Sequence, residues 1–346
     1  MTPILGEIAL SYALPLFVAS SLVILTAGTL LARVAQRLAH LTGIGQALMG
    51  AVFLGGTTSL PGIIAATTSA WQGHAELAMN TAVGGIAVQT AFLAIADMAY
   101  RKANLEHAAA APANLMQGSL LVTLLALPLL ASAVPEPAIL GVHPISLMMI
   151  AGYIFGLKLI SVSVEEPMWA PRQTRETHEE GERERRGRQK DRKLLWLQFA
   201  LLALVVAGAG YLVAQSGIAI SRETGLSESA VGAVFVAVST SLPELVTAVA
   251  AVRRGALTLA VGDVLGGNCF DILLVSLADI AYRQGSVYAA ISVQHTFVLA
   301  LSILLAGILL MGLLRRERYG IGRIGFESFL VLILYLGGMA FFLSTS

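Results

Sequence analysis

The sequence predicts an all-α polytopic membrane protein, with ten transmembrane helices arranged as two inverted five-helix repeats. The first observation is composition: 56% of the residues are hydrophobic, 12% are charged and the mean hydropathy is +0.78. Such a chain is too apolar for a soluble protein. The second is a duplication, because residues 42–101 return without a gap as residues 224–283. Duplicated, apolar segments interrupted by Gly and Pro are typical of secondary transporters.

Ten apolar stretches are long enough to cross a bilayer, which takes roughly 20 residues of helix. In chain order, the predicted spans are 9–33, 44–69, 76–100, 112–133, 144–163, 194–215, 227–252, 256–281, 288–312 and 322–344. The first is too long, and lacks the basic flank, for a cleaved signal peptide. The single Cys269 excludes an intramolecular disulfide bond.

The basic residues predict the orientation of the spans. If the N-terminus is outside and the spans alternate, nine of the 22 Lys and Arg residues lie in the inner segment 165–193 and ten in other inner loops. Only Arg222 and Arg283 face out, and Lys158 lies within a span. The positive-inside rule therefore supports outer N- and C-termini and a cytoplasmic linker at 165–193. We expect an integral protein of a prokaryotic cell (inner) membrane.

The duplication sets the domain organisation. The second copy begins five spans after the first, and an odd number of spans turns it upside down. We expect a first five-helix repeat at 1–164, the charged linker at 165–193 and a second five-helix repeat at 194–346. At the ends of matching spans, Asp97 and Asp279 are expected to form interfacial ion pairs with Arg101 and Arg283.

The chemistry is expected where polar atoms reach bilayer depth in the second repeat. Pro243 breaks its helix and frees the carbonyl of Ser239. Glu244 follows the break and Asp263 lies in the next span, and intramembrane carboxylates are functional by default. Asn268 is expected to face the same cavity as Asp263. Carboxylates, carbonyls and hydroxyls are hard ligands that suit Na⁺ or Ca²⁺.

The first repeat keeps the helix break and loses the charges. Gly62 stands at the position of Glu244, and Thr81 stands at that of Asp263. Its remaining hydroxyls are expected either to bind the cation or to join neighbouring helices by hydrogen bonds. These hydroxyls belong to Thr58, Ser59 and Thr81.

The second repeat resembles the second α-repeat of the calcium/cation antiporter superfamily, in its sodium/calcium exchanger branch. The matching runs are Thr-Ser-Leu-Pro-Glu at 240–244 and Gly-Asp-Val-Leu-Gly-Gly-Asn at 262–268. The first repeat resembles a degenerate first α-repeat, because the family normally has Glu at the position of Gly62. The resemblance implies exchange of Na⁺ against Ca²⁺ by alternating access. The cation-binding residues that it implies are Glu244, Asp263, Thr240, Ser241, Thr58 and Ser59.

The predicted function is secondary active antiport of small inorganic cations, with Na⁺ and Ca²⁺ as substrates. Two alternatives stay open: a cation/proton antiporter, and a non-transporting membrane protein that senses ions. The sequence has no enzyme motif in a suitable context, so no catalysis is expected. We expect no cofactor and no nucleic-acid partner. The bilayer, Na⁺, Ca²⁺ and H⁺ are the expected partners.

Overall fold

The structure, a computed structural model, is helical and describes most of the chain. The described residues are 9–42, 48–99, 104–134, 139, 141–165, 192–292, 294–316 and 325–345. The helices, with η marking π-helical turns, are α1 (Leu10–Val23), η1 (Ile24–Gly28), α2 (Thr29–Thr42), α3 (Leu48–Thr58), α4 (Leu60–Trp71), α5 (Ala75–Met98), α6 (Leu105–Ala108), α7 (Pro112–Ala133), α8 (Pro144–Glu165), α9 (Arg192–Thr224), α10 (Glu228–Ala230), η2 (Val231–Val236), α11 (Ala237–Thr240), α12 (Leu242–Arg253), α13 (Leu257–Asp271), α14 (Leu273–Ala281), α15 (Val287–Ala290), α16 (Gln294–Arg315) and α17 (Phe326–Thr345). The predicted linker lies almost entirely outside the described residues, at 166–191.

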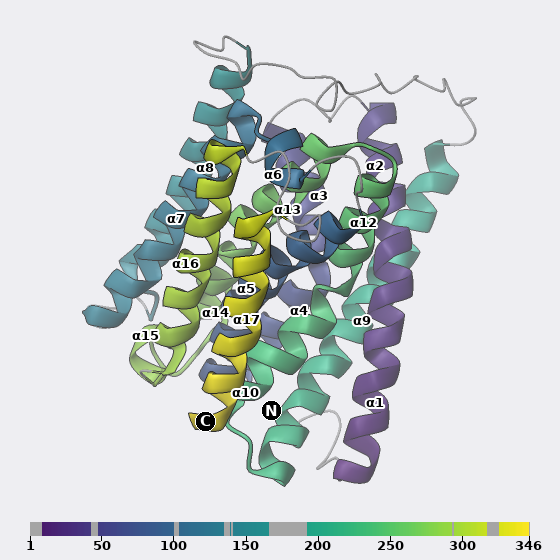
Figure 1. The fold of residues 1–346 in the computed structure, drawn as a ribbon. Helices are drawn as coiled ribbons and strands as arrows, with labels where there is room; N and C mark the ends of the chain where they lie inside the picture. Colours follow the sequence, from purple (N-terminus) through teal and green to yellow (C-terminus); the bar gives the residue numbers. More distant parts are fainter. Residues whose placement is uncertain are drawn as a thin grey trace.

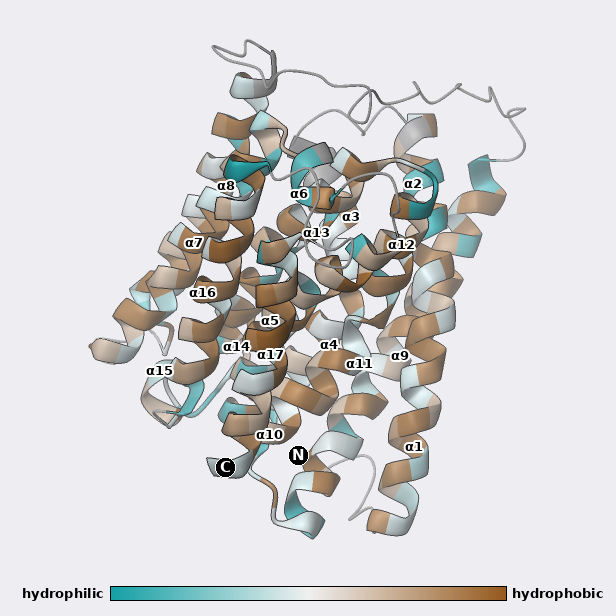
Figure 2. Ribbon diagram, in the orientation of Figure 1, coloured by the Kyte–Doolittle hydropathy of each residue, from teal (hydrophilic) through white to brown (hydrophobic). Residues whose placement is uncertain are grey.

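The helices stand side by side in one bundle (Figure 1), and hydrophobic residues follow their length (Figure 2). Among the described residues, eight helices are long and apolar enough to cross a membrane. A ninth candidate is the pair 228–240 and 242–253, which is bent by 45°. The predicted count of ten is therefore not confirmed. The span expected at 44–69 is two helices, α3 and α4, of 11 and 12 residues, and each alone is shorter than the roughly 20 residues that a membrane requires.

Both helix breaks occur at the same place in the repeat. Ser59 separates α3 from α4, and Ser241 separates α11 from α12. The backbone leaves the helical region there, with φ −78° and ψ 0° at Ser59 and φ −97° and ψ 4° at Ser241. Pro61 and Pro243 follow in the first turn of the new helix, where proline's missing N–H costs nothing.

The middle helices of the two copies run in opposite directions. The segment α6 follows the C-terminal end of α5 and packs on α13, and α15 follows the C-terminal end of α14 and packs on α5. The C-terminal end of each middle helix therefore lies against the middle helix of the other copy. The ends of α5 and α14 are tied in the same way, by an aspartate that accepts two backbone N–H groups at 2.7 to 2.9 Å. The two sets are Asp97 with Leu105 and Gly325, and Asp279 with Val287 and His143. Each pair of matching residues is separated by the repeat offset, so the duplication extends well beyond residues 101 and 283.

The expected ion pair at Asp279 is wrong. Asp97 and Asp279 are both fully buried, and their oxygens accept backbone N–H groups; among the described residues, Asp279 has no arginine partner. Arg283 lies over the ring of Trp71 instead, with its guanidinium carbon 5.0 Å from the ring centroid. Arg101 lies outside the described residues.

Two glycines let the long helices cross the helix breaks. A Cβ on Gly28 would lie 2.6 Å from Pro243 Cγ, and one on Gly210 would lie 2.7 Å from the carbonyl oxygen of Pro61. Both distances are shorter than real Cβ contacts allow. Each long helix, α1–η1–α2 or α9, therefore packs on the break of the opposite repeat. This contact places both breaks inside the bundle.

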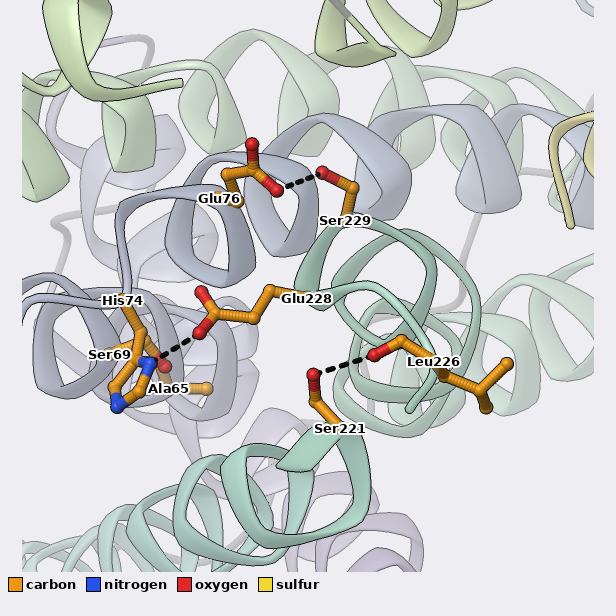
Figure 3. Close-up of polar contacts among 8 residues, drawn as sticks. All are labelled: Ala65, Ser69, His74, Glu76, Ser221, Leu226, Glu228 and Ser229. Carbon is orange, nitrogen blue, oxygen red and sulfur yellow. Dashed lines mark hydrogen bonds and ion pairs between the residues drawn. The ribbon is translucent and has the colours of Figure 1, made fainter. Parts of the chain in front are cut away.

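The turn between α4 and α5 joins the two halves at the end where α10 begins (Figure 3). His74 Nδ1 lies 2.6 Å from Glu228 Oε1, and Ser229 Oγ donates to Glu76 Oε2 at 3.0 Å. These contacts hold the start of α5 against the helix that leads into the second break.

Candidate cation-binding site

A small buried cavity lies between the two helix breaks. Its volume for a water-sized sphere is about 10 Å³, which is room for one water molecule or one small dehydrated ion. The residues that line it come from both repeats and are Ser59, Gly62, Thr81, Ala82, Gly85, Gln89, Thr240, Ser241, Glu244, Asp271 and Leu274.

Residues at equivalent positions of the two repeats form hydrogen bonds with each other across this cavity. Ser59 of the first repeat donates its hydroxyl proton to Asp271 Oδ1 of the second. Gln89 is the repeat equivalent of Asp271, and its Nε2 donates to Ser241 Oγ, the equivalent of Ser59, at 3.2 Å. Gln89 Nε2 also donates to Asp271 Oδ2 at 2.6 Å. Asp271 is therefore held in place through both of its oxygens.

Three other oxygens of the cavity have no hydrogen-bond partner although they are buried. They are Glu244 Oε2, Thr81 Oγ1 and Gln89 Oε1. A buried polar atom without a partner is costly, so such atoms mark a missing ligand or water. The unpartnered carboxylate oxygen accepts only, and it lies in the same cavity as a second carboxylate. The donor set therefore suits a small hard cation.

Five of the predicted site residues line the cavity: Glu244, Thr240, Ser241, Ser59 and Thr81. Two others do not line it. The Thr58 hydroxyl donates to the carbonyls of Leu54 and Gly55, both at 3.2 Å and within its own helix. Asn268 is buried, and its Nδ2 donates to Thr90 Oγ1 at 3.0 Å.

Asp263 was expected in the same cavity, and the structure places it outside that cavity. It is exposed and does not line the cavity. The reason is its position on α13, eight residues before Asp271. On a helix this separation is a rise of about 12 Å with a rotation of about 80°. Asp263 therefore lies at another depth and on another face.

The sequence analysis missed Gln89 and Asp271. The signal was present in the duplication, because these two polar residues occupy one repeat position inside matching apolar spans. Asp271 also follows Asn268 by one helical turn. Intramembrane acids are costly, and that alone made it a candidate.

The cavity contains two carboxylates, those of Glu244 and Asp271. Among the described residues, no three or more His, Cys, Asp and Glu side chains are grouped to hold a metal ion. Gly62 lines the cavity at the repeat position of Glu244, and a Cβ there would already lie 3.1 Å from a methyl group of Leu274. The charge available to a bound cation is therefore limited to two carboxylates and neutral oxygens.

The fold and the cavity define a polytopic α-helical membrane protein with the architecture of a secondary transporter. The particular family follows from comparison with known proteins. The family model described as sodium/calcium exchanger protein matches residues 12–168 and 193–344. The chain therefore belongs to the sodium/calcium exchanger protein family, within the calcium/cation antiporter superfamily.

Two curated relatives match part of the chain. The inner membrane protein YrbG of Escherichia coli is 34% identical over 113 residues, which are 32% of this chain and 34% of the relative. The sodium/calcium exchanger MaX1 of Methanosarcina acetivorans is 32% identical over 136 residues, 39% of each chain. The matched segments span between a third and two fifths of the length of these relatives.

A solved structure resembles the whole fold. The H⁺/Ca²⁺ exchanger CAX superposes with a TM-score of 0.69 over 96% of this chain and 86% of its own, at 13% sequence identity. At that identity the likeness concerns the fold.

Proposed function

We propose that this protein is a secondary active antiporter of small inorganic cations, which exchanges Ca²⁺ against Na⁺ by alternating access. The carrying observation is the cavity between the two helix breaks, where Glu244 and Asp271 meet beside buried oxygens that lack partners. The binding residues of this proposal are Glu244, Asp271, Thr240, Ser241, Ser59 and Thr81. The relative named a sodium/calcium exchanger supports the choice of ions.

A proton is the second candidate for the exchanged ion. Glu244 Oε2 is buried without a partner, so it is available to bind either a proton or a cation. The structural neighbour named an H⁺/Ca²⁺ exchanger shares the fold. Cation/proton antiport would therefore use the same residues. The two functions differ in whether Na⁺ or H⁺ is exchanged for Ca²⁺.

The proposed architecture is two inverted five-helix repeats at 1–164 and 194–346, joined by the linker 165–193. The opposite directions of α5 and α13–α14 support the inversion. The basic residues support a cytoplasmic linker and outer N- and C-termini. The relative named an inner membrane protein supports placement in a prokaryotic cell membrane.

The test is ion flux in proteoliposomes with Na⁺, Ca²⁺ and pH gradients imposed one at a time. Ca²⁺ uptake is expected when one of the other two gradients is present, and that gradient identifies the exchanged ion. Glu244→Gln is expected to abolish uptake, because it removes the cavity's unpartnered charge and keeps the side-chain shape. Glu223→Gln is the control, because Glu223 is a partly exposed surface residue that pairs with Arg222 at 3.6 Å. If the wild-type protein moves no cation under any of the three gradients, the antiporter proposal is wrong and the protein behaves as an ion sensor.

The two carboxylates also limit the charge moved per cycle. They neutralise one Ca²⁺ or two monovalent ions, and each further cation in a low-dielectric cavity is costly. We therefore propose an electroneutral cycle. Flux measured under a membrane potential clamped by K⁺ and valinomycin tests it, and a strong voltage dependence would contradict it.

A further inference from the structure

A second cluster of buried acids lies away from the transport cavity, at the end of the bundle where α6 meets α16 and α17 (Figure 1). Its three carboxylates come from different helices and are almost inaccessible. Asp97 at the end of α5 is 0% exposed, Glu106 on α6 is 1% exposed and Glu327 on α17 is 7% exposed. The transport mechanism proposed above uses none of them.

The three acids differ in how their oxygens are satisfied. Both oxygens of Asp97 accept backbone N–H groups, from Leu105 at 2.8 Å and Gly325 at 2.9 Å. Glu106 Oε1 accepts the backbone N–H of Ser328 in the first turn of α17 at 2.6 Å. However, Glu106 Oε2 and Glu327 Oε2 are buried without any partner. Two such oxygens in one cluster require an explanation.

Glycine brings these two side chains together. A Cβ built on Gly312 of α16 would lie 3.0 Å from Glu106 Cγ and 3.2 Å from Glu327 Cγ. The two Cγ atoms are therefore separated by no more than the sum of these distances. Gly325 leaves the remaining room, because its Cβ would overlap Glu106 Oε2. The two glycines therefore leave the space that the side chains of Glu106 and Glu327 occupy.

The charged groups around the pair do not satisfy its free oxygens. Arg315 Nη1 pairs with the other oxygen of Glu327, Oε1, at 3.0 Å. His107 Nδ1 lies 2.8 Å from the carbonyl oxygen of Arg316, and Asp97 adds a negative charge. Arg316 Nη2 donates to the carbonyl oxygen of His107 at 3.4 Å. Among the described residues, α7 has no titratable side chain and α13 has none before the exposed Asp263.

A proton fits this pair better than a metal ion. No group of three or more metal-ligating side chains occurs in the part of the chain that the structure describes. Burial raises the pKa of Glu106 to about 7, with contributions from the charges of Asp97 and Glu327, while the bonds to Ser328 lower it. Around neutral pH, a single proton can therefore be held between the two carboxyl groups.

We propose that Glu106 and Glu327 form a proton-binding pair, in which a proton between their free oxygens ties α6 to α17 and its release separates them. The proton converts one carboxylate into a hydrogen-bond donor to the other. When it leaves, two like charges face each other in buried surroundings. α6 follows α5, which carries Thr81 and Gln89 of the cavity. Proton release therefore loosens the end of a helix that forms the transport site.

Infrared difference spectroscopy of the purified protein at a series of pH values tests this pair without any transport. The wild-type protein is expected to lose the band of a protonated carboxyl group with a midpoint near neutral pH. Glu106→Gln and Glu327→Gln are each expected to remove this transition. Glu244→Gln and the surface control Glu223→Gln are expected to keep it, which separates the pair from the transport cavity.

The glutamine variants also test the geometry. A glutamine amide donates a hydrogen bond as the protonated acid does, so Glu106→Gln is expected to fold and to resemble the wild-type protein at acid pH. A transition that persists unchanged in both variants would overturn the proposal. Failure of both variants to fold would do so too, because the amide supplies the proposed hydrogen bond. Glu106→Asp is expected to shift the midpoint rather than to remove the transition.

Discussion

Replacing Asp271 by Asn separates the site that the structure shows from the one that the sequence predicts. The cavity has room for one small ion and is lined by both carboxylates, so a cation bound there lies close to Asp271. For two charges about 4 Å apart at an effective dielectric constant of about 20, one carboxylate contributes about 4 kcal/mol per unit of cation charge. Its loss corresponds to at least about a thousandfold weaker binding, which is the figure for one unit of cation charge, and to a larger loss for Ca²⁺.

The substitution is expected to preserve the fold. Asn has the shape of Asp, and rotation of the Gln89 amide lets Oε1, which is free in the structure, accept from the new amide group. The assay is binding of radioactive calcium to the purified protein, together with flux in proteoliposomes. The matched control is Asp263→Asn, which removes an exposed carboxylate from the same helix. It is expected to weaken binding far less than Asp271→Asn does, because Asp263 does not line the cavity.

The reverse result would refute this reasoning. If Asp271→Asn binds Ca²⁺ as the wild-type protein does, the cation does not lie between Glu244 and Asp271. If Asp263→Asn then abolishes binding, the assignment from sequence is correct and the cavity is not the transport site.

Three further outcomes are expected. Gly62→Glu adds a third carboxylate to the lining of the cavity, and its Cβ alone requires a methyl group of Leu274 to shift, so divalent affinity or charge movement should increase in flux assays of the folded variant. Gly210→Ala, which meets a backbone carbonyl at 2.7 Å, should lower stability by about 1–3 kcal/mol in thermal unfolding, whereas Gly208→Ala, with open space around it, should not. Because the pKa of Glu106 is raised from 4.5 to about 7, its contribution to stability is complete below pH 4.5 and is lost as the pH rises through about 7. The loss is about 3 kcal/mol at most, and it should be absent from the pH series of Glu106→Gln.

Local features of the sequence determine much of the fold. The apolar stretches predict the long helices, and the matching prolines at 61 and 243 predict both helix breaks, because proline cannot continue the hydrogen bonding of a helix. The duplication predicts that the copies form one site. Glu244 could also be selected, since it is an intramembrane acid directly beside a break.

Only the tertiary structure decides which other polar residues reach the cavity. Asp263 and Asp271 are both acids of one apolar helix, and their sequence surroundings do not say which face of α13 packs against α5. That rotation results from contacts between helices, such as the pairing of Gln89 with Asp271 across the repeats. Asp97 and Asp279 are a second example, because their partners are backbone groups brought from distant segments. Within a membrane, a helix is specified by its own residues, but the neighbour of each of its faces is specified by the packing of the whole bundle.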